Sequence, residues 1–425
     1  MDKKQLRQLF SLPVIVAALG YFVDIYDLLL FSIVRRESLT DLGVPAAELF
    51  DSGEFLLQVQ MIGLLVGGII WGVMGDKRGR LSVLFGSILL YSLANIANGF
   101  VTNVPQYAIL RFIAGIGLAG ELGAGVTLVS ETLPPKLRGW GTTIIATVGL
   151  MGAVLANIVS KTFAWQTAYF IGGGLGLILL IARVSVFESG IFLRTVEKTI
   201  PRGNFFLLFQ NRTRLRKFLG CIFIGLPIWY AIGILITFSP EFASALGVGE
   251  IKAGDAVMLS YLGLAAGDLF SGFLSQTFRS RKSIVRLFIL LTFFFILLYL
   301  FSPFRSTTFF FITCFTLGFG IGYWALFVTI AAEQFGTNLR ATVATSVPNF
   351  IRGTVIPLTL MFKFLRTTIS EHFEGSSVVG DPKHTGLIYG ALIVGIFTIV
   401  IAVISLKAID ETFGRDLDFE EEHQS

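Results

Sequence analysis

Charged residues are scarce in this sequence. Only 14% of its 425 residues are Asp, Glu, Lys or Arg, whereas 54% are hydrophobic and the mean hydropathy is +0.77. Soluble domains carry about 25% charged residues, so the composition excludes an ordinary soluble domain. The pI near 9.2 is attributed to basic loops that face anionic lipid, and no nucleic-acid partner is expected.

Cysteine and histidine are also rare, and no enzymatic motif is present. Cys221 and Cys314 lie within apolar segments, where we expect them to pack rather than form a disulfide or bind a metal. The three histidines lie in loops or the tail, so neither a histidine-based proton relay nor a metal site is expected. Without a P-loop or hydrolase triad, we expect neither an enzyme nor an ATP-driven pump, and no cofactor.

Long apolar runs fill most of the chain. Each is about 20 residues long, enough for a helix to cross about 30 Å of hydrocarbon. Strands of a membrane barrel would alternate apolar and polar residues, and these runs do not. The sequence therefore predicts an all-α membrane protein with twelve transmembrane helices, over residues 12–34, 55–74, 81–101, 106–130, 140–161, 166–187, 216–240, 254–277, 284–302, 307–333, 341–366 and 385–406.

The basic residues predict the topology. With both termini in the cytoplasm, most of the 33 Lys and Arg lie in cytoplasmic tails and loops, as the positive-inside rule requires. A long polar connection rich in Arg and Lys separates six predicted spans from six. The expected organisation is an N-terminal six-helix bundle over 1–187, a cytoplasmic linker over 188–215, a C-terminal six-helix bundle over 216–407 and a cytoplasmic tail over 408–425.

The two halves share sequence patterns. Residues 63–72 (GLLVGGIIWG) match residues 263–272 (GLAAGDLFSG) at an offset of 200. Residues 131–138 (ETLPPKLR) match residues 333–340 (EQFGTNLR) at an offset of 202. Glycine spacing alone could reflect close helix packing, but Glu and Arg at equivalent positions favour a duplication. Parallel repeats place a substrate site near the membrane midplane, between the halves.

Three motifs resemble those of one transporter family. The basic turn at 72–80 (GVMGDKRGR) is similar to the signature between helices two and three of the major facilitator superfamily. Residues 111–121 (RFIAGIGLAGE) resemble its Arg-then-glycines pattern, and 131–139 (ETLPPKLRG) resemble the sugar-porter and metabolite or organic-anion–proton symporter branches. The resemblance implies two pseudo-symmetric six-helix bundles and secondary transport by alternating access.

Charges at the predicted cytoplasmic helix ends are candidates for a gate. Anions favour helix N-termini and cations favour C-termini, so such residues can pair and hold the cytoplasmic side closed. The alternative is that they set topology only. Gln276 stands where the first copy has an aspartate, so the second copy of the turn is incomplete. The gate candidates are Gly72, Asp76, Gly79, Arg80, Glu131, Arg138, Glu333 and Arg340.

Two aspartates in the first predicted span are the leading candidates for proton coupling. Asp24 and Asp27 are three residues apart, which places them on one face of a helix. A charge at membrane depth costs about 2.5–3.5 kcal/mol on insertion scales, so these side chains are expected to face a cavity, pair or bind protons. The alternative is a structural ion pair with Arg111 or Arg352. The pattern DIYD also resembles sialate, aromatic-acid and phosphate proton symporters.

Two further buried carboxylates are candidates for proton coupling. Glu121 follows the glycine run of the fourth predicted span, as it does in the metabolite–proton symporters that the chain resembles. Asp268 replaces Gly68 of the first repeat, which indicates a role that belongs to one half, such as proton carriage or pairing.

Buried cations and mid-span aromatic residues are candidates for the substrate site. Arg352, near the midplane, and Arg111 could hold an anion through charge-assisted hydrogen bonds, and Asn349 lies one helical turn from Arg352. Arg111 could instead be an internal helix partner, as the resemblance implies. The aromatic candidates, for which packing is the alternative, are Trp229, Tyr230, Tyr323 and Trp324.

These patterns predict a secondary transporter that imports a small organic anion or phosphate-like solute together with protons. It is expected to be a monomer among membrane lipids, in a plasma membrane of the bacterial inner-membrane type. Proton-driven efflux of amphipathic compounds is one alternative, and a non-transporting membrane receptor with the same fold is another.

Overall fold

Helix starts follow local signals in the sequence. The computed structural model describes residues 3–78, 80–121, 133–187, 205, 207–374 and 381–414, and these residues form helices and loops with no strand. Asn103 and Asn211 accept hydrogen bonds from backbone N–H groups at two helix starts, and Ser280, Ser306 and Asp381 do so at three others. Such side chains satisfy the donors that a first helical turn leaves unpaired.

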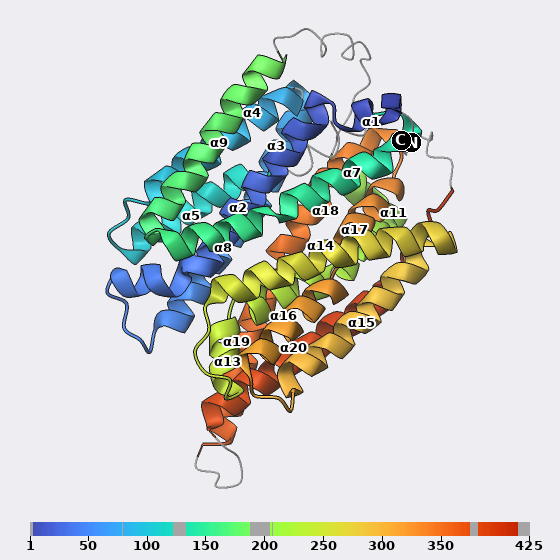
Figure 1. The fold of residues 1–425 in the computed structure, drawn as a ribbon. Coiled ribbons are helices and arrows are strands. Elements are labelled where there is room, and N and C mark those ends of the chain that lie inside the picture. The colour runs from blue at the N-terminus through green and yellow to red at the C-terminus, as the bar shows by residue number, and fades with distance from the viewer. Residues whose placement is uncertain are drawn as a thin grey trace.

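The described helices fall into two sets that follow one another along the chain (Figure 1). The first set comprises α1 (Lys3–Leu9), α2 (Leu12–Asp41), α3 (Leu49–Arg78), α4 (Arg80–Asn98), α5 (Val104–Leu118), α7 (Pro135–Leu150), α8 (Gly152–Thr162) and α9 (Trp165–Phe187). The second set comprises α10 (Leu207–Gln210), α11 (Arg212–Ile224), α12 (Leu226–Tyr230), a π-helical segment (Ala231–Ile236), α13 (Ser239–Ala245), α14 (Ala253–Phe278), α15 (Arg281–Phe301), α16 (Thr307–Gly320), α17 (Trp324–Glu333), α18 (Thr337–Gly353), α19 (Val355–His372) and α20 (Pro382–Ser405).

The helical prediction is confirmed over the described residues. Nine spans there are long and apolar enough to cross a membrane, and two shorter apolar helices, Val83–Asn98 and Val104–Leu118, match the third and fourth predicted spans. The pair α18 and α19 covers the more polar eleventh span. Most of the predicted linker, 188–204 and 206, lies outside the described residues, and α11 begins at Arg212, four residues earlier than predicted.

Several spans are broken where glycine or proline occurs. The fifth predicted span bends at Met151 between α7 and α8, the tenth between α16 and α17 around Gly322, and the eleventh at Thr354 between α18 and α19. The seventh contains Pro227 and then the π-helical turn. Breaks within a span leave backbone groups that side chains must satisfy, and they cluster at functional depth in transporters.

The repeated glycines serve equivalent packing contacts in the two halves. A Cβ atom on Gly63 or Gly67 of α3 would collide with a backbone carbonyl of the 111–118 stretch of α5. A Cβ atom on Gly263 or Gly267 of α14 would collide in the same way with carbonyls of α16. Only glycine allows this approach, so the duplicated pattern corresponds to a duplicated helix pair.

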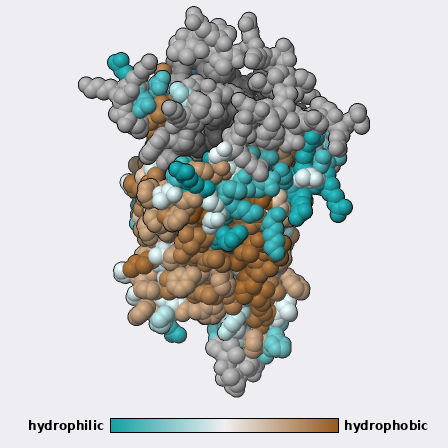
Figure 2. All heavy atoms as spheres, turned by 90° about the vertical axis from the view of Figure 1, so that its right-hand side faces the viewer, coloured by the Kyte–Doolittle hydropathy of each residue, from teal (hydrophilic) through white to brown (hydrophobic). Residues whose placement is uncertain are grey.

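The surface and the ends of the bundle agree with a membrane protein. Figure 2 shows a broad hydrophobic band with hydrophilic residues above it. The segment after α20 lies near α1 at one end of the bundle, called here the termini end (Figure 1). The opposite end, called the far end, carries the loops at 42–48, 99–103, 163–164, 246–252 and 302–306. Exposed apolar side chains recur along α20, at Ile393, Ile396, Phe397, Val400, Val403 and Ile404.

Candidate functional site

A buried arginine links the two halves at the centre of the bundle. Arg352 on α18 is 1% exposed, and its guanidinium lies 3.6 Å from Oδ2 of Asp24 on α2. It donates a long hydrogen bond of 3.5 Å to Oδ1 of Asn349, while its Nε and one terminal nitrogen have no hydrogen-bond partner. Neither oxygen of Asp24 has a hydrogen bond either. The ion pair is therefore loose, and both members keep unused hydrogen-bonding capacity.

Two of the four predicted aromatic residues lie beside this pair. The Arg352 guanidinium carbon is 5.7 Å from the centroid of the Trp229 ring, a cation–π distance. Trp229 also meets Trp324 edge-on at 6.4 Å, and its indole N–H has no partner. By contrast, the Tyr230 hydroxyl donates to the Ala391 carbonyl at 2.6 Å. The fourth, Tyr323, donates to the Ile224 carbonyl at 2.9 Å, so both tyrosines are engaged in packing.

A second arginine occupies an aromatic enclosure in the first half. Arg111 on α5 is fully buried, with none of its three nitrogens hydrogen-bonded. Its guanidinium carbon lies 5.4 Å from the Phe31 ring centroid and 5.6 Å from that of Tyr169. Asp27, also fully buried, has no hydrogen bond on either oxygen. Within the described part of the chain, neither residue has an ion-pair partner within 4.0 Å. The structure therefore holds two buried centres, Arg352 with Asp24 and Arg111 with Asp27, in which the arginine could bind an anion and the aspartate could bind a proton.

Glu121 is held in a tight ion pair that sequence reasoning did not find. Both of its oxygens accept from Arg183 of α9, at 3.1 and 2.9 Å, and both side chains are at most 2% exposed. Ser87 donates to the same carboxylate at 3.3 Å. Arg183 lies 62 residues away on the sixth span, so spacing gave no indication of it. This geometry favours the pairing of two helices over proton carriage.

Asp268 caps a broken helix. Its Oδ1 accepts the backbone N–H of Ala325 at 3.0 Å, in the first turn of α17. The span is interrupted between α16 and α17, so these N–H groups have no helical acceptor of their own. The other oxygen, Oδ2, has no partner. Asp268 thus makes a contact that Gly68, at the equivalent position of the first half, has no side chain to make.

The structure describes the surroundings of only some of the predicted gate residues. Glu333 pairs with Arg281 at 2.6 Å, inside the second half. Gly72 has open space where a Cβ would lie. Asp76, Arg80, Arg138 and Arg340 lie in α3, α4, α7 and α18 with undescribed side chains, and Gly79 and Glu131 lie outside the described residues.

At the far end, charged side chains join the two halves directly, and sequence reasoning missed them. Arg35 of α2 pairs with Glu241 of α13 at 2.6 Å. Asp51 of α3 pairs with Arg366 of α19 at 2.8 Å. Lys161 of α8 pairs with Asp255 of α14, which also accepts from Asn157 at 3.0 Å. The sequence shows these charges beyond or at the span ends but carries no signal for their partners, which are 94 to 315 residues away.

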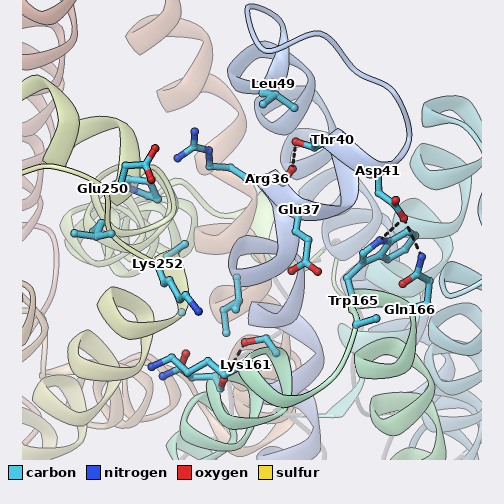
Figure 3. Close-up of a pocket in the computed structure, with 18 residues that line it drawn as sticks. Arg36, Glu37, Thr40, Asp41, Leu49, Lys161, Trp165, Gln166, Glu250 and Lys252 are labelled. Atoms are coloured by element: carbon cyan, nitrogen blue, oxygen red, sulfur yellow. Dashed lines mark hydrogen bonds between the residues drawn. The ribbon is translucent and has the colours of Figure 1, made fainter.

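A cavity of about 980 Å³ opens at the same end (Figure 3). Its wall mixes charges of both signs, including Arg36, Glu37 and Lys252, while Trp165 and Gln166 donate to Asp41 at 2.9 and 3.0 Å. None of the predicted substrate or proton residues lines it. It lies between the halves and is separate from the two arginine centres.

Comparisons with known proteins agree on one family. The model of the family described as Major Facilitator Superfamily matches residues 15–356. The chain is similar to the sialic acid transporter NanX of Escherichia coli, with 26% identity, covering 67% of this chain and 68% of that protein. It is similar to the niacin transporter NiaP of Acinetobacter baylyi, with 26% identity, covering 77% and 80%. Among solved structures, the proton:xylose symporter XylE superposes with a TM-score of 0.69 at 16% identity, covering 97% of this chain and 98% of that one.

Proposed function

Because this chain belongs to the major facilitator superfamily, and is therefore a multi-pass membrane transporter and not an enzyme, we propose that it moves a small organic anion together with protons by alternating access. The observation that supports this most directly is Arg352, a buried cation with two unused N–H groups beside a loosely held carboxylate. The relatives named above carry sialic acid and niacin, which favours a carboxylate among possible anions.

The Arg352–Asp24 pair suggests how proton and anion are coupled. An uncompensated buried charge is strongly destabilising, so we infer that Arg352 keeps one anionic partner throughout the transport cycle. In the described state that partner is Asp24, at 3.6 Å. When a proton neutralises Asp24, a substrate carboxylate takes its place on Arg352 through charge-assisted hydrogen bonds. The total charge of the site is the same before and after, so proton and anion enter together.

The aromatic wall and the second centre fit the same scheme. Trp229 and Trp324 supply ring faces and an unpaired indole N–H beside Arg352. Asp27 and Arg111 are a second buried carboxylate and guanidinium, both in the first half, and we assign to Asp27 the second proton position. Glu121 and Asp268 are assigned structural roles, because Arg183 engages both oxygens of Glu121 and the α17 backbone engages one oxygen of Asp268.

The basic loops favour a cytoplasmic termini end, so the far end faces outward in this proposal. Ion pairs cross between the halves on that outer side, which supports an outward-closed assignment for the described state. The predicted gate residues at the termini end would then hold the cytoplasmic side in the opposite state. A bacterial inner membrane is the proposed location, since the relatives named are bacterial.

Uptake into proteoliposomes tests the proposal. Labelled carboxylates, with nicotinate and sialic acid in the panel, are offered outside at acid pH with a neutral interior. We expect the gradient to accelerate uptake of at least one of them. Arg352→Gln should abolish uptake, and Asp24→Asn should bind substrate yet lose the acceleration. If the pH gradient did not change the rate of uptake, or if Asp24→Asn kept the full acceleration by the gradient, the proposed coupling would be refuted.

Matched controls separate these effects from general charge loss. Glu48→Gln removes a carboxylate from an exposed loop position, and Arg305→Gln removes an exposed arginine. Both should transport like the unmodified protein. Tyr230→Phe, which removes a packing hydrogen bond on the neighbouring residue of Trp229, should lower stability without changing the response to the gradient.

A further inference from the structure

A row of polar residues joins α3 to α19 at the far end. Asp51 accepts from Arg366 at 2.8 Å, and seven residues further along α3 Gln58 donates to Thr359 at 2.9 Å. Thr359 lies seven residues before Arg366, so the two helices run antiparallel and keep register over two turns. This row, called the α3–α19 seam, consists of Asp51, Glu54 and Gln58 on α3 and Thr359, Lys363 and Arg366 on α19.

Glu54 occupies the middle of the seam without a partner. Three residues after Asp51 on α3, it stands opposite Lys363, three residues before Arg366 on α19. Yet Glu54 is 1% exposed, and neither of its oxygens has a hydrogen bond. Lys363 instead lies 3.5 Å from Asp51, and both of those side chains are about half exposed. An ionised carboxylate buried in this way would be very unfavourable.

A stack of side chains that includes Arg366 of the seam comes from both halves in alternation. The Arg366 guanidinium lies 4.0 Å from the Phe50 ring, which stacks on Phe238 at 4.4 Å, and Arg35 lies 4.6 Å from the other ring. Arg35 and Phe50 belong to the first half, and Phe238 and Arg366 to the second. Separating the halves breaks every layer of this stack, so Glu54 passes from full burial to water in one step.

The charged groups around Glu54 are few. On its own helix the nearest is Asp51, α19 presents Arg366 and Lys363, and α2 presents Arg35, whose side chain packs against Gly53. The other helices that pack on α3 are α4, α5 and α18. Their described titratable side chains include Tyr91 on α4, Tyr107 and Arg111 on α5, and Arg352 on α18. Tyr107 bonds to Tyr169, Arg111 lies over the Phe31 ring and Arg352 pairs with Asp24.

We propose that Glu54 is a proton-binding site of the seam: it carries a proton while α3 and α19 are in contact and gives it up to the far-side water when they separate. The proton sits on a carboxyl oxygen, which removes the buried charge and leaves Lys363 free to serve Asp51. It enters and leaves on the same side, so it adds nothing to the number of protons transported. External acid therefore favours the closed far end. This inference rests on the alternating access of the proposed function.

The distance between the two halves at the far end, measured as a function of pH, tests whether acid favours the closed far end. Spin labels at Ala46→Cys and Arg305→Cys report on the first and second halves, because Ala46 and Arg305 lie in exposed loops and both native cysteines are buried. The protein is held in lipid nanodiscs without substrate, between pH 5 and pH 8. An exposed glutamate titrates near about pH 4.3, so one linked proton should lower the closed-to-open ratio by up to about tenfold per pH unit.

Glu54→Gln is the decisive variant. It should keep the far end closed at pH 8 and remove one proton from the pH dependence, and Glu54→Met should do the same if the amide disturbs folding. Asp51→Asn, the control, should lower the closed-to-open ratio at every pH but retain its pH dependence. If Glu54 were instead ionised and paired with Lys363, Glu54→Gln and Lys363→Gln would both open the far end. That result, or an unchanged pH dependence in both Glu54 variants, would overturn the proposal.

This test is independent of solute coupling. No substrate is present, and Asp24 and Asp27 are unaltered. Failure of the uptake experiment would leave the Glu54 result standing, and an inert Glu54 would leave the Arg352–Asp24 exchange intact.

Discussion

Glu121→Gln distinguishes a structural carboxylate from one that carries protons. The substitution keeps the size of the side chain but removes its charge, leaving Arg183 as a buried cation whose two short hydrogen bonds, 3.1 and 2.9 Å, are weakened or lost. Breaking a buried pair by removing one partner costs about 3–5 kcal/mol. The amide oxygen still accepts one bond, so we expect the lower end, about 3 kcal/mol. That corresponds to roughly a hundredfold loss in the folding equilibrium constant.

Unfolding by a denaturing detergent, monitored by tryptophan fluorescence, measures this loss. A double-mutant cycle with Arg183→Gln isolates the pair, and the double variant should be less destabilised than the sum of the single ones. Glu48→Gln, on an exposed loop, is the matched control and should change stability by less than about 0.5 kcal/mol. If the Glu121→Gln protein were as stable as the unmodified one but lacked proton-driven uptake, the structural role of Glu121 would be refuted. Glu121 would then be a candidate for carrying the proton.

Two further predictions concern helix starts. Asp268→Ala should destabilise the protein by about 1 kcal/mol through loss of the α17 cap, and Asp268→Asn, which keeps an acceptor, by less; a proton-carrying Asp268 would instead make the Asn variant fail in gradient-driven uptake. Glu411 accepts from Ser280 and from the N–H groups of Arg281 and Lys282 at the start of α15. Partial burial opposes ionisation, but these hydrogen bonds and that from the Phe413 N–H prevail and hold the pKa of Glu411 below its usual value.

The sign of the Glu411 effect follows from that lowered pKa. Its stabilisation is complete above the pKa of an unfolded glutamate, near about 4.3, and disappears as pH falls through the lower folded value. The protection of the first turn of α15 against hydrogen exchange, relative to the intrinsic rate at each pH, should therefore fall only in acid. Glu411→Gln should show fast exchange already at pH 7. Equal protection in the two proteins at pH 7 would contradict the capping role.

The sequence was sufficient for the spans and for the repeat. Apolar length alone located the helices, because a chain in lipid must satisfy its own backbone. The glycines at 63, 67, 263 and 267 were readable because close approach leaves no alternative residue. Arg352 and Asp24 could be singled out because charges at membrane depth are costly.

What the sequence could not supply was the identity of partners. Glu121 was predicted without Arg183, since the two lie on different spans. The cap role of Asp268 depends on a break at residues 321–323, and the sequence did not show that this break lies beside Asp268. Tyr230 and Tyr323 were expected to line the site, yet their hydroxyls bind carbonyls at 2.6 and 2.9 Å. The rotation of a helix about its axis decides whether such a side chain faces the site or a neighbouring helix. The aromatic residues within these spans show no clear periodicity that would predict this rotation.

One repeat position now has two incompatible tasks. In the first half, Gly68 leaves room for Asn349 of the other half, whose Cβ would be 3.0 Å from an added Cβ. Asn349 uses that room to donate to the Ala119 carbonyl at 2.8 Å. In the second half, Asp268 fills the equivalent position and holds α17. The copies can therefore no longer be exchanged, because a chain with Gly or with Asp at both positions would lack one of these two contacts.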